Sequence, residues 1–162
     1  MKTYIILATS LFLGITLSAQ TTEVSEAPSL KIMIQDVPEG ESDLVVRVYQ
    51  EGAFLLSGTE NLVKETKLIP SGTRATIDFS GLNTGTSYAI VVFDDVNGNG
   101  KLDKSWNGRP LEAYAYTGLG KTNGTPSFSD ASFELNPETR ALFVQMQKVK
   151  KNNSNNSLTQ KN

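Results

Sequence analysis

The sequence predicts an all-β domain, an antiparallel two-sheet sandwich of immunoglobulin-like type. Three observations support this fold class. Apolar residues recur at every second position in several short segments, and Gly, Asn and Pro fill the gaps between those segments. No long stretch has the period of an amphipathic helix. Seven or eight such segments in about 120 residues are typical of a sandwich domain.

Five segments are the clearest strand candidates, and we expect each of them to form a strand. In the first, Leu30, Ile32 and Ile34 share one face. The fourth is apolar on both faces, which is typical of a central strand with two covered sides. The five segments are residues 30–37, 43–50, 74–82, 87–95 and 141–149. Weaker candidates are residues 53–56, 62–68, 112–117 and 131–135.

The turn before the fourth segment contains the pattern of a tyrosine corner. Leu82, Gly85 and Tyr88 lead into that segment. We expect Tyr88 to pack its ring in the core and to hydrogen-bond its hydroxyl to the turn backbone, a structural role and not a catalytic one. Further on, Phe128 and Phe133 are expected core residues.

The two ends of the chain have compositions unlike that of the domain. Residues 1–19 have a short basic start, an apolar run and a small residue at Ala19, the layout of a signal peptide cleaved after Ala19. The alternative is an uncleaved anchor helix, but the run is short for a membrane span. We expect a secreted or periplasmic protein with a flexible lead-in at 20–28, the sandwich domain at 29–149 and a disordered polar tail at 150–162.

Composition excludes several classes of function. The chain has no Cys and no His, which removes disulfides, a Ser-His-Asp triad and the common zinc sites. It has 15 basic and 17 acidic residues, so no basic surface for nucleic acid is expected. No second apolar stretch approaches the length of a membrane span. Any bound metal would have oxygen ligands, which favours calcium or magnesium.

The segment DVNGNGKLD is the candidate metal loop. With Asp95 at the first position of a calcium loop, Asn97, Asn99 and Asp103 fall at the third, fifth and ninth. Gly100 takes the sixth position, where glycine allows a sharp turn, and position seven supplies its backbone carbonyl. The predicted ligands of a weak, structural calcium ion are Asp95, Asn97, Asn99, the Lys101 carbonyl, Asp103 and a carboxylate from farther along the chain, Glu112.

Parts of this pattern leave alternatives open. Position twelve of the loop, which should bring a bidentate carboxylate, is Trp106, so Glu112 is the first candidate for the missing ligand and Asp94 the second. Leu102 can pin the loop to the core. The alternative is an ion-free turn rich in Asn and Gly, because Asn-Gly is a strong hairpin signal. Against a tight hairpin, no returning strand is evident before Pro110.

Three blocks in this order resemble a known family. They are the loop from Asp95 to Asp103, the pair Pro110 and Glu112, and the segment PSFSDASF that begins at Pro126. Together they resemble the small secreted bacterial proteins catalogued as domain of unknown function 2141, over roughly residues 30–148. The resemblance implies a single β-sandwich after a signal peptide and implies no activity. Residues 113–120 depart from it, because a stretch richer in Gly and Asn is expected there.

Two functions stay open at this point. The first is a non-enzymatic module that contacts an envelope protein or a glycan through Trp106, Tyr114 and Tyr116, if these side chains are exposed. The second is a hydrolase that cleaves a glycan with Glu112 and either Asp94 or Asp130, because paired carboxylates can hydrolyse a glycosidic bond. Asp130 has two further possible roles: it can cap a turn, or it can be a distant metal ligand.

Overall fold

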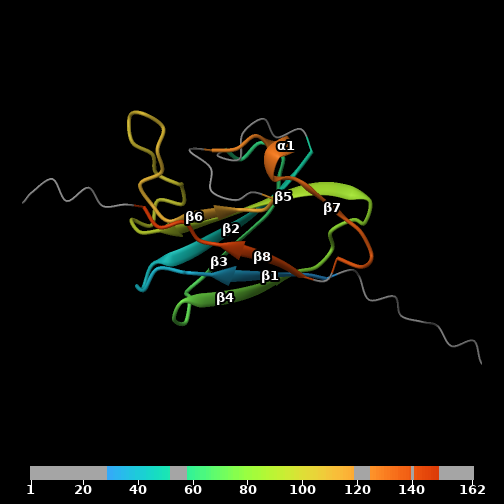
Figure 1. Cartoon of the computed structure of the whole chain (residues 1–162), viewed down its shortest axis with the longest axis horizontal. Coiled ribbons are helices and arrows are strands. Elements are labelled where there is room, and N and C mark those ends of the chain that lie inside the picture. The colour runs from blue at the N-terminus through green and yellow to red at the C-terminus, as the bar shows by residue number, and fades with distance from the viewer. Residues whose placement is uncertain (1–28, 52–57, 119–124, 140, 150–162) are drawn as a thin grey trace, which may run out of the picture.

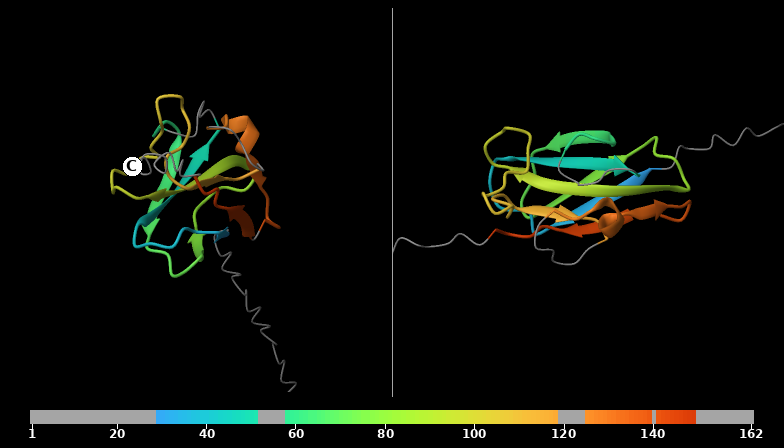
Figure 2. Two further views of the ribbon diagram at one scale, coloured as in Figure 1. Left: turned by 60° about the vertical axis from the view of Figure 1, so that its left-hand side comes forward. Right: turned by 90° about the horizontal axis from the view of Figure 1, so that it is seen from above.

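Two sheets lie face to face in the structure, a computed structural model that describes residues 29–51, 58–118, 125–139 and 141–149. Within those residues, eight strands and one short helix form an all-β architecture whose sheets are mainly antiparallel (Figures 1 and 2). The expected signal peptide at 1–19, the lead-in at 20–28, the candidate strand at 53–56 and the tail at 150–162 lie outside the described residues.

The smaller sheet has three strands in the order β4-β1-β8. Their bounds are Leu30–Gln35 for β1, Arg74–Phe79 for β4 and Ala141–Gln145 for β8. β1 pairs with β4 in antiparallel fashion but with β8 in parallel fashion. The expectation of antiparallel pairing throughout is therefore wrong for β1 and β8. The chain enters β8 from the other sheet, so no tight turn fixes its direction relative to β1.

The larger sheet has five strands, with the order β3-β2-β5-β6 and β7 also paired to β5. Their bounds are Asp43–Gln50 for β2, Leu62–Leu68 for β3, Thr86–Asp95 for β5, Tyr114–Tyr116 for β6 and Phe133–Leu135 for β7. β2 runs along the whole of β5, from the pair Asp43 and Asp95 to the pair Gln50 and Tyr88. On the opposite edge of β5, β7 pairs with its first residues and β6 with later ones.

Apolar side chains cover both faces of the larger sheet. Between the sheets, Ile32 of β1 and Val46 of β2 belong to one buried cluster. On the outer face, Val91 and Phe93 of β5 belong to a second cluster that includes Phe128 of the helix. Figure 1 shows this helix, α1 (Phe128–Ala131), on the side of the larger sheet away from the smaller one. The prediction that residues 87–95 form a strand buried on both faces is confirmed.

The helix α1 occupies part of a segment for which a strand was expected. Residues 131–135 form the end of α1 and then β7, so only Phe133–Leu135 is extended. Asp130 and Ser127 form a capping box, in which the Ser127 hydroxyl accepts from the Asp130 N–H and the Asp130 carboxylate accepts from the Ser127 N–H. Of the roles open to Asp130, the structure supports the cap. Phe128 is buried and Phe133 half-buried in the core, as expected.

Tyr88 occupies the predicted tyrosine corner. Its side chain is buried, and its hydroxyl accepts a hydrogen bond from the Asn83 N–H at 3.0 Å. Gly85 between them has a φ of 72°, a conformation that glycine adopts without steric cost. The turn is therefore fastened to the first residues of β5.

We predict that Tyr88→Phe lowers the free energy of unfolding by about 1 kcal/mol, since the Asn83 N–H loses its acceptor while the packing of the ring is kept. Urea denaturation of both proteins measures the difference. The slope of free energy against urea should not change, because the same surface is exposed on unfolding. A variant as stable as the parent would contradict the assigned role of the hydroxyl.

A candidate metal loop at the end of β5

The candidate loop begins where β5 ends. Asp94 and Asp95 are the last residues of this strand, and both are buried because the sheet is covered on both sides up to this point. The chain returns as β6 only at Tyr114, so β5 and β6 form a hairpin with a long connection, residues 96–113. The expectation that no strand returns before Pro110 is consistent with this topology.

Asp95 carries a fully buried carboxylate. Its Oδ2 accepts from the Gly100 N–H at 2.9 Å and lies 3.4 Å from the Lys67 ammonium. Its Oδ1 is buried and has no hydrogen-bond partner in the described structure. Burying a charged oxygen without a partner costs several kcal/mol, so such an atom requires an explanation. A bound cation would supply one.

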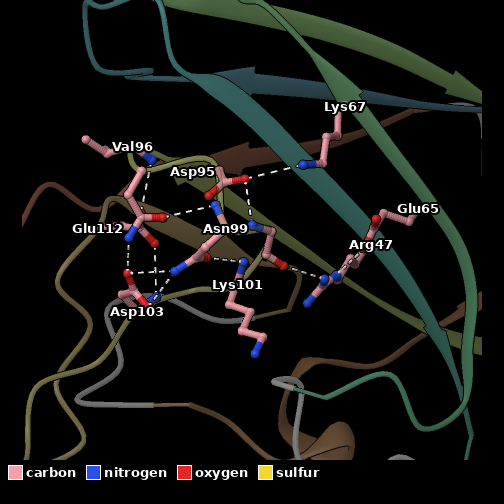
Figure 3. Close-up of polar contacts among 11 residues, drawn as sticks. Arg47, Glu65, Lys67, Asp95, Val96, Asn99, Lys101, Asp103 and Glu112 are labelled. Carbon is pink, nitrogen blue, oxygen red and sulfur yellow. Dashed lines mark hydrogen bonds and ion pairs between the residues drawn. The ribbon is translucent and has the colours of Figure 1, made fainter.

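Two asparagines fold the loop between Asp95 and Asp103. The Asn97 Oδ1 accepts from the Asn99 N–H at 3.1 Å, and the Asn99 Oδ1 accepts from the Lys101 N–H at 2.7 Å. These are successive Asx turns. The amide nitrogens of both asparagines donate to the Asp103 carboxylate, at 2.5 Å and 3.1 Å. The side chains of both asparagines thus contact that of Asp103, and Figure 3 shows the contact of Asn99.

Glu112 closes the loop at both ends. Its Oε1 accepts from the Val96 N–H and its Oε2 from the Asp103 N–H, both at 3.0 Å. Burial raises the pKa of Glu112, and the two backbone hydrogen bonds partly lower it again. The negative charges of Asp103 and Asp95 add to the rise in this pKa. Each oxygen keeps a further lone pair. Glu112 therefore braces the loop, and its role as a metal ligand stays a prediction.

Arg47 fastens the loop to the larger sheet. Its guanidinium lies 5.2 Å from the centre of the Phe93 ring, and it donates to the Gly100 carbonyl at 2.8 Å and to Glu65 at 2.6 Å. Sequence reasoning missed this residue. The available signal was one charged residue in the otherwise apolar segment 44–49, which becomes buried. Leu102 packs against the outer cluster of the same sheet, as expected.

A cavity of about 810 Å³ opens beside the loop. Asp94, Asp103 and Glu112 line it together with the apolar Val96 and Leu111. The Asp94 carboxylate accepts from the Ser42 hydroxyl at 2.5 Å. Asp130 is not among the lining residues, so of the carboxylate pairs considered for a hydrolase, Asp94 with Glu112 is the one that this cavity brings together.

The three aromatic residues expected near the loop do not form one exposed patch. Tyr114 and Tyr116 are buried in the outer cluster because they belong to β6, and their rings meet edge to face at 5.4 Å. Trp106 is 98% exposed. The interpretation of the two tyrosines as contact residues is therefore wrong, and only the tryptophan remains as a surface aromatic of that group.

The described residues contain no cluster of three or more Asp, Glu, His or Cys side chains with the arrangement of a metal site. A cation in this loop would therefore depend on amide and carbonyl oxygens beside the carboxylates. No helix in the described part of the chain is long and apolar enough to cross a membrane.

Comparison with known proteins identifies a family. The profile of a family described as "Uncharacterized protein conserved in bacteria (DUF2141)" matches residues 32–142. This range holds the whole candidate loop and both sheets, except the first two residues of β1 and the last three of β8. Neither the curated proteins nor the solved structures include a significant match to this chain.

We predict that Arg47→Lys lowers the free energy of unfolding by about 1.5–3 kcal/mol, because an ammonium cannot reach Glu65 and the Gly100 carbonyl with the geometry of a guanidinium fork. Hydrogen exchange should accelerate at the amides of residues 98–101. Arg74→Lys, at an exposed position of β4, is the matched control and should change neither quantity. Equal stability of the Arg47 and Arg74 variants would show that the loop is not fastened through Arg47.

Proposed function

The chain belongs to the bacterial family DUF2141, and from this premise we propose that it is an exported, non-enzymatic module stabilised by calcium. In this proposal the Asp95–Asp103 loop holds a weak structural calcium ion, and the end of the domain that carries the loop contacts an envelope protein or a glycan. The finer assignment of the two sheets to an immunoglobulin-like topology is part of the same proposal.

The orphaned Oδ1 of Asp95 is the single observation that carries the calcium proposal. A hard cation satisfies a buried carboxylate oxygen that no protein donor reaches. The amide oxygens of Asn97 and Asn99 each accept one N–H and keep a lone pair for an ion. Asp103 adds a second carboxylate, and the Lys101 carbonyl the neutral ligand expected at position seven. All of these ligands are oxygen atoms, as calcium requires.

Electrostatics favours a weak site. The carboxylates of Asp95, Asp103 and Glu112 attract a cation, but the Lys67 ammonium lies 3.4 Å from the Asp95 carboxylate and opposes it. Extracellular calcium modules bind with dissociation constants of about 10⁻⁴ to 10⁻³ M, and we place this loop in that range. An ion so held would order the loop and would not transmit a signal.

Export and the absence of catalysis complete the proposal. Residues 1–19 have the layout of a signal peptide, which supports a secreted or periplasmic location. Catalysis is disfavoured by the hydrogen bonds of Glu112, because both of its oxygens hold backbone N–H groups that an acid or base would have to release. The alternative is a hydrolase of glycans that uses Asp94 and Glu112, which line one cavity. Turnover of chromogenic glycosides by the purified protein would favour that alternative.

We predict that about 10 mM calcium stabilises the protein by roughly 2.7 kcal/mol if the dissociation constant is about 0.1 mM, a rise of several degrees in the melting temperature. Asp95→Asn should lose most of this rise because it removes a charge from the site. Asp78→Asn, in the other sheet and with an exposed carboxylate, is the matched control and should keep it. Scanning calorimetry with and without a chelator measures the shift.

Magnesium should raise the melting temperature less than calcium, since its small octahedral shell fits a flexible carbonyl-rich loop poorly. Calcium should also slow hydrogen exchange between residues 94 and 112 while the strands stay equally protected. The loop would be an ion-free Asx turn if calcium left the melting temperature unchanged. The same would follow if calcium raised the melting temperatures of the Asp95 and Asp78 variants equally.

A further inference from the structure

Residues 104–110, here called the 104–110 turn, project from one end of the domain between β5 and β6 (Figure 1). Trp106 lies in this turn with 98% of its surface exposed. It is the one tryptophan in the sequence. Most large aromatic side chains are largely buried, and tryptophan is enriched at binding interfaces. A fully exposed indole ring is therefore expected to contact a partner.

Hydrogen bonds close the turn below the indole ring. The Ser105 N–H donates to the Arg109 carbonyl at 2.8 Å, and the Gly108 N–H to the Ser105 carbonyl at 2.9 Å. The Asn107 Oδ1 accepts from the Ser105 hydroxyl at 2.5 Å. At the base, the Leu111 N–H donates to the Asp103 carbonyl at 2.8 Å. The backbone that presents Trp106 is therefore ordered before any partner arrives, which lowers the entropy cost of binding.

The turn and its base carry positive charge in an acidic protein. Lys101 and Arg109 are exposed and Lys104 is half-buried, and none of the three forms an ion pair within the described residues. The nearby carboxylate of Asp103 is already engaged by the amides of Asn97 and Asn99. The whole chain has a net charge of −2, whereas residues 104–110 contain Lys104 and Arg109 and no acidic residue.

We propose that the 104–110 turn binds an acidic saccharide. The face of the Trp106 ring stacks on the apolar face of a sugar ring, and the Arg109 guanidinium pairs with a carboxylate on the same or the next sugar. A planar guanidinium donates two parallel hydrogen bonds to a carboxylate, which fixes its orientation. The acidic saccharide is the partner of the module proposed above, so this inference rests on the proposed contact with a glycan. It does not depend on the calcium ion.

The polarity of the turn favours a saccharide over a lipid surface or an apolar protein face. Trp106 is flanked by Ser105, Asn107 and Gly108, so a tip inserted into lipid would carry polar groups with it. An apolar protein hot spot also needs neighbours that exclude water around the central side chain, and these flanking residues are small or polar. A hydrated sugar ring needs one apolar face and several polar neighbours, which matches this turn.

The fluorescence of the single tryptophan tests the proposal directly. A galacturonate hexasaccharide is titrated into the full chain in the presence of a chelator, with uncharged maltohexaose as the neutral control. We expect a saturable change in Trp106 emission with the acidic sugar and none with the neutral one. Calorimetric titration then compares variants: Trp106→Ala should abolish binding and Arg109→Gln should weaken it about tenfold, equivalent to about 1.4 kcal/mol. Both sites are exposed, so folding should be unaffected.

Two control variants separate the turn from general surface effects. Arg74→Gln removes an exposed arginine from β4, and Phe143→Ala removes an aromatic side chain that is 66% exposed on β8. Both should bind the acidic hexasaccharide like the parent. Three outcomes would each overturn the proposal. The neutral sugar could bind as well as the acidic one, or the Arg109 variant could bind as well as the parent. Alternatively, phosphatidylglycerol vesicles could shift the emission while the saccharide does not. A calcium-dependent rise in melting temperature without saccharide binding would overturn this inference and leave the calcium proposal standing.

Discussion

The burial of the Asp95 carboxylate at the end of β5 is the constraint on which the rest of this site depends. The strand is covered on both faces, so its last residues are buried whether they are apolar or not. The Gly100 N–H and the Lys67 ammonium offset part of the free-energy cost of burying the carboxylate, and both contact the same oxygen. Arg47 then holds Gly100 from the sheet side. The second oxygen is left without a donor in the described structure. In our proposal a cation is the partner of this oxygen.

Asp103 connects the loop to the turn that follows it. Its carboxylate receives the amides of Asn97 and Asn99, its N–H is held by Glu112, and its carbonyl accepts from Leu111 at the base of the 104–110 turn. An ion that orders the loop would therefore also fix the base of the turn that presents Trp106. The two proposals meet at Asp103 but are tested separately, because stability reports on the loop and tryptophan emission reports on the turn.

Local sequence patterns predicted much of the fold. Period-two alternation placed β1, β2, β4 and β8, and the apolar run before Asp94 predicted β5 and its burial on both faces. Tyr88 also behaves as its motif predicts. The misses are long-range: the parallel pairing of β1 and β8, the burial of Tyr114 in the second core, and the contact of Arg47 with a carbonyl 53 residues away. Such pairings depend on how distant segments meet, which alternation within one segment does not encode. For the site, the side chains of Asn97 and Asn99 contact that of Asp103, while binding of a metal by these residues stays a prediction. The bracing contacts of Glu112 become visible only after folding.

A crystal structure determined from calcium-containing solution tests the central claim most directly. The account predicts anomalous density from a cation within about 2.3–2.6 Å of the Asp95 Oδ1, the range of calcium–oxygen distances in proteins. Oxygens of Asn97, Asn99 and Asp103 should complete the shell. A structure in which calcium is present in solution but the Asp95 Oδ1 contacts only water or a protein donor would contradict the account.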